Sequence, residues 1–213
     1  MAISSRFVAL GFFLVVLPQT PVSIPVAPFS SINLPDGGHV IVRESPTQRV
    51  TLIQGNRDLT RIEVTDRGML MIVDNCDTKC PRGYELEVEI LTPRVASLAI
   101  SNGGWIRTVG SFSGQSELSA RVAHGGTIDA RSMLVDNVNA AVEQGGRIFT
   151  SPRTSLTANV YQGGVVLYWG NPRVQRSIRK GGVVQKGTAA EFAVPLEEAA
   201  AVVEPVHSIR SKH

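Results

Sequence analysis

The sequence lacks the short motifs that mark common catalytic and nucleotide-binding sites. It contains no G-x-S-x-G, no H-E-x-x-H and no P-loop, and its glycine pairs do not have the G-x-G-x-x-G spacing of a dinucleotide site. Asp129 and Asp136 are candidates for the two carboxylates of a glycosidase or for calcium ligands, but their spacing is diagnostic of neither. We therefore predict a protein that is not an enzyme and uses no cofactor or metal, with a polysaccharide-acting enzyme as the alternative.

The sequence also lacks a large excess of either charge. Its 21 Lys and Arg residues and 18 Asp and Glu residues give a formal net charge of +3 at pH 7. Nucleic-acid-binding proteins usually carry a strong positive charge or a basic stripe, and this near balance gives no such electrostatic footprint. We predict no nucleic-acid partner.

The apolar run near the N-terminus is too short to be a permanent membrane anchor. It covers residues 7–17 and so has 11 residues, against about 20 for a helix that spans a bilayer. One arginine precedes it, and a proline and small residues follow, as in a secretory signal peptide. We predict a signal peptide over residues 1–27, cleaved near Ala27 or Ser23, and an exported protein without a transmembrane span. A buried strand or an uncleaved anchor is the alternative.

Cysteine is scarce, with only Cys76 and Cys80 in the whole chain. The two lie between expected strands at 69–73 and 84–90, and an exported chain meets oxidising conditions, so we predict a disulfide that closes this loop. A zinc site would need two more ligands, and no histidine lies nearby in the sequence. A redox pair usually has two residues between its thiols, whereas this pair has three. Both remain alternatives to the disulfide.

Paired glycines, by contrast, recur through the second half of the chain. The pairs are Gly103-Gly104, Gly125-Gly126, Gly145-Gly146, Gly163-Gly164 and Gly181-Gly182. Their first glycines are separated by 22, 20, 18 and 18 residues, which suits one coil of a β-solenoid and is too short for a βαβ unit of about 30 residues. The spacing therefore predicts a repeat.

Apolar residues stand at fixed positions around these glycines. Three residues before each first glycine are Ile100, Val122, Val142, Val160 and Ile178, and three after it are Ile106, Ile128, Ile148, Val166 and Val184. Five before it are Leu98, Ala120, Ala140, Ala158 and Arg176, and seven before it are Ala96, Leu118, Val138, Leu156 and Val174. The intervening residues, such as Asn139 and Glu143, are mostly polar. This alternation is the period of a strand with one buried face.

These observations predict an all-β fold, a parallel β-helix or solenoid with Gly-Gly corners over residues 96–187. Residues 28–95 alternate in short segments, with a hairpin expected where Gly68 joins 62–64 to 69–73, and we predict strands and hairpins that continue into the same stack. For residues 188–213 we predict a cap over the last coil, a short helix over 196–203 and a disordered tail.

The chain resembles the putative auto-transporter adhesin head GIN domain family over roughly residues 29–187. The motifs that carry the resemblance are His124-Gly-Gly-Thr-Ile128, Asp136-Asn-Val-Asn139, Gln144-Gly-Gly-Arg-Ile148 and Tyr168-Trp-Gly-Asn-Pro172 followed by Lys180-Gly-Gly182. The resemblance implies a bacterial, exported, all-β protein with coiled parallel strands, and it supplies no catalytic motif. The family has no defined biochemical role, although its name suggests adhesion.

Three groups of residues are candidates for a binding surface. The residue before each first glycine is polar in every repeat, namely Asn102, His124, Gln144, Gln162 and Lys180. Aromatic residues follow the glycine pairs at Trp105, Phe149, Tyr168 and Trp169, and cations gather at Arg147, Arg153, Arg173, Arg176, Arg179 and Lys180. The polar row could bind a polymer, the aromatic residues sugar rings, and the cations acidic glycans or lipid headgroups. The alternatives are hydrogen bonds within the stack, core packing and a solvated face.

From these features we predict an exported cell-envelope or adhesin-like binding protein, located in the periplasm or outside the bacterial cell. Its solenoid surface would meet a glycan or protein partner. A purely structural envelope protein without a specific ligand is a further alternative. The sequence predicts no oligomeric state.

Overall fold

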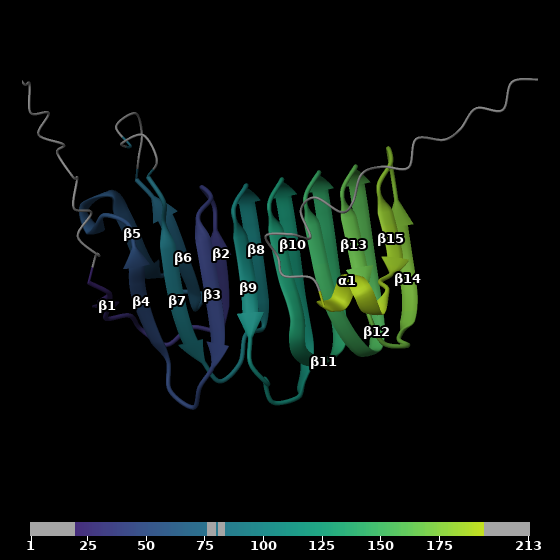
Figure 1. Ribbon diagram of the computed structural model, residues 1–213, viewed down its shortest axis with the longest axis horizontal. Helices are drawn as coiled ribbons and strands as arrows, with labels where there is room; N and C mark the ends of the chain where they lie inside the picture. Colours follow the sequence, from purple (N-terminus) through teal and green to yellow (C-terminus); the bar gives the residue numbers. More distant parts are fainter. Residues whose placement is uncertain (1–19, 76–79, 81–83, 194–213) are drawn as a thin grey trace, which may run out of the picture.

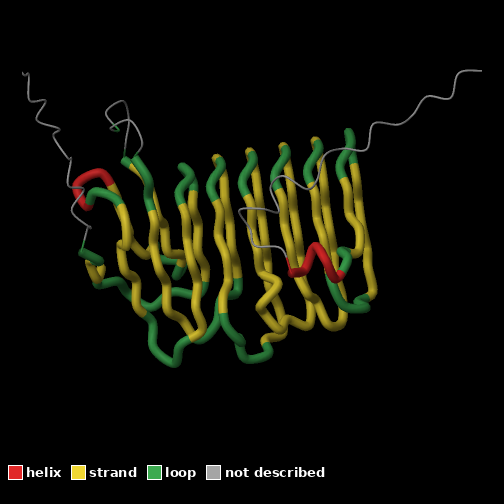
Figure 2. The backbone as a smooth tube through the Cα atoms, in the orientation of Figure 1, coloured by secondary structure: helices red, strands yellow, loops and turns green. Residues whose placement is uncertain are grey.

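The computed structural model describes residues 20–75, 80 and 84–193. Within them the chain folds into fifteen β-strands, one 3-10 helix and one short α-helix. Figure 1 shows the strands side by side along one axis in two layers, and Figure 2 shows that turns join the layers at both ends of the strands. The prediction of a parallel β-solenoid is confirmed.

One layer is built around strands that lead into the glycine turns, and we call it the entry sheet. In spatial order it contains β5 (Thr60–Val64), β6 (Met69–Asp74), β2 (Ser31–Leu34), β8 (Ser97–Asn102), β10 (Gln115–His124), the second parts of β11 (Thr127–Gln144) and β12 (Arg147–Gln162), and β14 (Arg173–Ile178). All its neighbours pair in parallel except β5, which is antiparallel to β6 in the expected hairpin.

The other layer, which we call the exit sheet, is built around strands that leave those turns. In spatial order it contains β1 (Val22–Ile24), β4 (Arg49–Gln54), β7 (Glu87–Thr92), β3 (His39–Glu44), β9 (Trp105–Val109), the first parts of β11 and β12, β13 (Val165–Tyr168) and β15 (Val183–Lys186). Only the pairs β1–β4 and β4–β7 are antiparallel. The 3-10 helix Arg57–Leu59 joins β4 to β5, and α1 (Ala189–Ala193) follows β15.

Equivalent residues of successive coils pair directly, as the repeat predicts. In the entry sheet Val122 pairs with Val142, which pairs with Val160. The residues three positions after the first glycine of each pair form an unbroken row with Val40, and every member is at most 2% exposed: Val40, Ile106, Ile128, Ile148, Val166 and Val184. Such inward rows from both sheets make one continuous core, so each coil buries its apolar side chains only against its neighbours.

A sixth glycine pair belongs to the same stack and was missed by the sequence prediction. Gly37-Gly38 follows Leu34 and precedes Val40, which lie three residues before and three after its first glycine. Its coil, formed by β2 and β3, lies between the β6–β7 coil and the β8–β9 coil rather than at the end of the stack. Neighbours in the stack are therefore not always neighbours in the sequence.

One prediction near the start of the repeat is wrong, and two others concern residues outside those that the structure describes. Ala96 was expected to face inward, but Val95 is the buried residue, because β8 begins only at Ser97 and the alternation does not extend back through the bend. Cys76 lies outside the described residues, so its disulfide with Cys80 stays a prediction. The helix expected over 196–203 also lies outside them.

Candidate functional site

The polar residues that precede the glycine pairs form a row along one edge of the entry sheet. Asn102, His124, Gln144 and Gln162 pair with one another in successive coils, and three of them are exposed while Gln162 is half-buried. Each carbonyl of the last three accepts from the first glycine of the preceding coil, as in Gly125 N–H to Gln144 O at 3.0 Å. We call these four residues the corner row.

Lys180 departs from the row that the sequence predicted. Gly163 N–H donates to Gly181 O, at 3.2 Å, instead of to the Lys180 carbonyl. The last turn is thus displaced by one residue, and Lys180 takes a φ of 51°, which is uncommon for a residue with a side chain. Its ammonium group instead reaches back to 5.4 Å from the centre of the Tyr161 ring.

The corner row borders an open groove on the outer face of the entry sheet. The groove has a volume of about 490 Å³. Its lining comes from β11, β12 and the β14 coil and comprises Ala141, Val142, Glu143, Gln144, Asn159, Val160, Tyr161, Ser177 and Arg179. Gln144 belongs to both the row and the groove, so the two features adjoin each other on the surface.

Tyr161 is the aromatic residue of this groove, and sequence reasoning missed it. Tyr161 is 44% exposed, in contrast to the buried Val160 that precedes it in β12. Val160 next to it points inward, so strand alternation could have identified Tyr161 as an outward aromatic residue. An exposed tyrosine offers a flat apolar ring together with a hydroxyl group.

The charges around the groove are unevenly compensated. Glu143 forms an ion pair with Arg121 of the preceding coil, with 2.5 Å between Nη2 and Oε1. Arg179 and Lys180 form no ion pair with a carboxylate within the described part of the chain. The groove therefore carries a net positive character at its β14 end.

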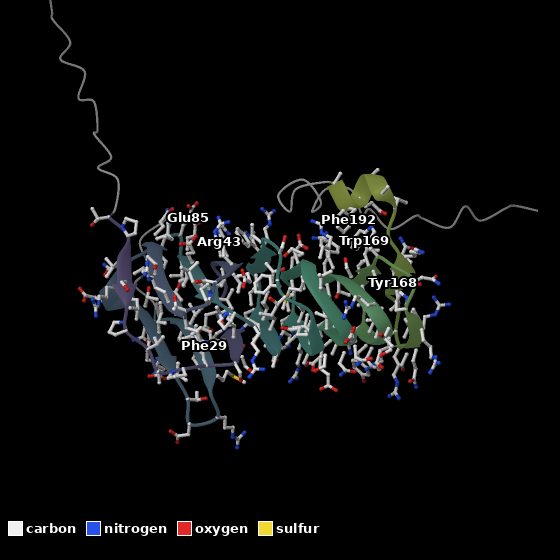
Figure 3. The ribbon with its side chains drawn as sticks, turned by 90° about the horizontal axis from the view of Figure 1, so that it is seen from below. Phe29, Arg43, Glu85, Tyr168, Trp169 and Phe192 are labelled. Atoms are coloured by element: carbon white, nitrogen blue, oxygen red, sulfur yellow. The ribbon has the colours of Figure 1, made fainter. Side chains whose placement is uncertain are left out.

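The predicted aromatic surface is mostly a packed cluster on the outer face of the exit sheet. Phe149, Leu167 and Trp169 bury one another, and Trp169 Nε1–H donates to Thr188 O at 2.9 Å. Figure 3 shows Phe192 of α1 lying against Trp169, and their ring centres are 5.4 Å apart. Trp169 is only 9% exposed, so it is not available to a ligand.

The other two predicted aromatic residues also have packing partners. Trp105 is half-buried and stacks on His39, with 4.6 Å between ring centres. Tyr168 is half-buried and packs against the main core. Neither residue lines the groove, so the structure separates the predicted aromatic residues from the corner row.

Arg131 fastens the C-terminal segment over the aromatic cluster. Its guanidinium group binds both carboxylate oxygens of Asp129, at 2.8 and 2.7 Å, and donates to the carbonyls of Glu191 and Phe192 at 2.9 and 2.8 Å. It also lies about 5.5 Å from the rings of Phe149 and Trp169. The α1 turn is preceded by Thr188, which exchanges two hydrogen bonds with Glu191 in a capping box.

The two aspartates that would support an enzyme do not form a pair. Asp129 is buried in the exit-sheet part of β11 and bound by Arg131, whereas Asp136 follows the bend to the entry sheet and is bound by Arg153 at 2.6 Å. Each carboxylate is thus neutralised by its own arginine. Within residues 20–75, 80 and 84–193, no group of three or more His, Cys, Asp or Glu side chains could hold a metal ion.

The fold and the groove define a two-sheet parallel β-solenoid with an open groove on the outer face of one sheet. Residues 111–172 match the family described as putative auto-transporter adhesin, head GIN domain, which confirms the resemblance over that part of the chain. No curated protein matches the chain significantly. None of the described helices is long and apolar enough to cross a membrane.

Three solved structures illustrate the similarity. A putative adhesin from Bacteroides fragilis is 18% identical, with a TM-score of 0.43 over 79% of this chain and 97% of that one. A putative lipid binding protein from Parabacteroides distasonis is 16% identical, with a TM-score of 0.32 over 79% and 96%. A putative cell adhesion protein from Clostridium sporogenes is 10% identical, with a TM-score of 0.36 over 78% and 99%.

Proposed function

We propose that this chain is an adhesin-like, non-enzymatic binding protein that contacts a saccharide of a cell envelope through the groove beside the corner row. The observation that carries the proposal is the exposed Tyr161 ring among amide and charged side chains. The description of the family matched by residues 111–172 supports the adhesin-like role. The proposal includes export to the periplasm or the cell surface.

The chemistry of the groove suits a sugar. One face of a pyranose ring is apolar and packs on an aromatic ring, while its hydroxyl groups exchange hydrogen bonds with amides and cations. Tyr161 supplies the ring, and Gln144, Asn159 and Arg179 supply polar groups around it. The volume of about 490 Å³ lies within the range of about 300–1,000 Å³ typical of small-ligand sites.

The repeat extends this chemistry along the solenoid axis. Corner-row side chains from successive coils are about 4.8 Å apart, the distance between neighbouring strands. None of the four has a side-chain hydrogen bond within the described part of the chain, so their polar atoms are free to meet a ligand. A polymer lying along the row would make many weak contacts, which is the usual way that a solenoid surface binds.

A saccharide panel tests this function. The mature protein is applied to immobilised bacterial envelope and extracellular saccharides, in parallel with Tyr161→Ala and Leu134→Ala. Leu134 is 49% exposed but does not line the groove, so its variant controls for loss of an exposed apolar side chain. We expect binding that falls at least tenfold in Tyr161→Ala and stays unchanged in Leu134→Ala. Failure of every saccharide to bind, or equal loss in both variants, would overturn the proposal.

A further inference from the structure

The last coil of the solenoid has a charge unlike that of the rest. Residues 173–187 contain five cations and no acidic residue. The cations are Arg173, Arg176, Arg179, Lys180 and Lys186, and all of them are exposed. The whole chain carries a formal charge of only +3, so its positive charge is concentrated at this end.

Only part of this charge serves the fold. Arg176 lies in the inward row, and its Nη1–H donates to Val184 O at 3.0 Å, so it closes the end of the core. Arg179 lines the groove, and the Lys180 ammonium group lies 5.4 Å from the Tyr161 ring centre. These two cations stand where a ligand stacked on the tyrosine would meet them.

Glu143, the carboxylate that lines the groove, does not strongly repel an anion because it is paired with Arg121. Glu143 lines the groove, but both Nε–H and an Nη2–H group of Arg121 bind its Oε1. The pair is close to neutral as seen from the groove, whereas Arg179 and Lys180 have no carboxylate partner in the described structure. An anionic group next to Tyr161 would therefore be attracted.

We infer that the ligand of this groove is an acidic saccharide, in which a sugar ring packs on Tyr161 while its carboxylate binds Arg179 and Lys180. This inference rests on the proposed function and specifies the chemical class of its ligand. The adjacent aromatic ring favours a sugar acid over a lipid headgroup, because a charge cluster alone would attract both. The corner row extends the contact to hydroxyl groups of neighbouring sugar units.

The test compares one polymer with and without its charge. Binding of polygalacturonate and of its fully methyl-esterified form is measured by titration calorimetry at two salt concentrations. The variants are Arg179→Gln, which lies in the groove lining, Lys180→Gln, whose ammonium group lies near the Tyr161 ring, and, as a matched control, Lys186→Gln, which removes a cation of the same coil that does neither. Circular dichroism melts establish that each variant is folded.

We expect the acidic polymer to bind at least tenfold more tightly than the ester and to weaken with salt. Arg179→Gln and Lys180→Gln should each lose about tenfold or more, and Lys186→Gln less than about threefold. Equal binding of acid and ester that still depends on Tyr161 would overturn this inference and leave the proposed function standing. Equal loss in Lys186→Gln, or stronger binding to anionic phosphatidylserine vesicles than to the polymer, would also overturn it. If neither polymer binds and no saccharide of the panel binds, both this inference and the proposed function are refuted.

Discussion

Gly146 lies directly over Val122 of the preceding coil. A Cβ atom placed on Gly146 would be 2.5 Å from Val122 Cγ1, which is too close for real atoms, and 3.0 Å from Gly126 O, which is a tight contact. A Cβ placed on its neighbour Gly145 would meet nothing within 4 Å. The two glycines of one pair thus have different physical roles: the first provides a backbone angle, and the second also provides space for the coil beneath it.

This difference predicts unequal effects of alanine at the two positions. Both glycines have positive φ, 69° at Gly145 and 92° at Gly146, so alanine in either place costs about 1–2 kcal/mol of backbone strain. Alanine also lowers the conformational entropy of the unfolded chain, which offsets part of this strain in both variants. Gly146→Ala must also displace Val122, and we expect a total loss of about 2–4 kcal/mol in the free energy of unfolding, against about 1 kcal/mol for Gly145→Ala. Urea unfolding measures both, and equal losses would contradict the assigned roles.

The attachment of the C-terminal segment depends on Arg131. Asp129 is 4% exposed, so Arg131→Ala leaves a buried carboxylate without its arginine and removes two hydrogen bonds to the α1 segment. We expect a loss of about 3–5 kcal/mol in the free energy of unfolding and rapid hydrogen exchange over 188–193. The matched control is Arg43→Ala, because its ion pair with Glu89 is exposed and should contribute less than about 1 kcal/mol. Unchanged exchange over 188–193 in Arg131→Ala would show that the segment is held by other contacts.

Arg176 replaces the apolar residue that other coils have at its position. It pairs with Ala158 in the inward row, and an inward charge at the end of a stack opposes the addition of a further coil. We expect Arg176→Leu to self-associate through this end as the protein concentration rises, which sedimentation velocity would detect. Arg173→Leu adds the same side chain outside that row, at a position that pairs with Ser155. We expect this variant to sediment as the parent protein does. Identical sedimentation of both variants and the parent would contradict this role.

The repeat could be predicted from the sequence because it is local and periodic. Glycines at fixed offsets from branched residues specify the turn, the buried rows and the parallel stacking, and all three are found. The position of the β2–β3 coil could not be predicted in the same way. Leu34 and Val40 match the pattern, but inward and outward alternation does not specify which coil stacks on which.

The candidate site was predicted only in part. The corner row follows from its place before the glycines, but the groove depends on side chains from three coils that meet only in the folded stack. Trp169 was a candidate for sugar binding because aromatic residues serve both packing and recognition. Its burial results from Phe192 and Thr188, which a local capping box positions, and the signal for that box is the Thr188 to Glu191 spacing.

Strand β1 predicts where the mature chain begins. Val22 pairs with Leu52 and Ile24 with Val50, and both β1 residues pack against the core at the first edge of the exit sheet. Cleavage near Ala27 or Ser23 would remove or divide this strand and expose the backbone of β4 to the solvent. We therefore expect N-terminal sequencing of the exported protein to give a start upstream of Val22. A chain that begins at Pro28 should melt at a lower temperature than one that begins at Thr20, because it lacks three residues of sheet pairing. A mature start at Pro28 with no change in melting temperature would mean that β1 contributes nothing to the stability of the fold.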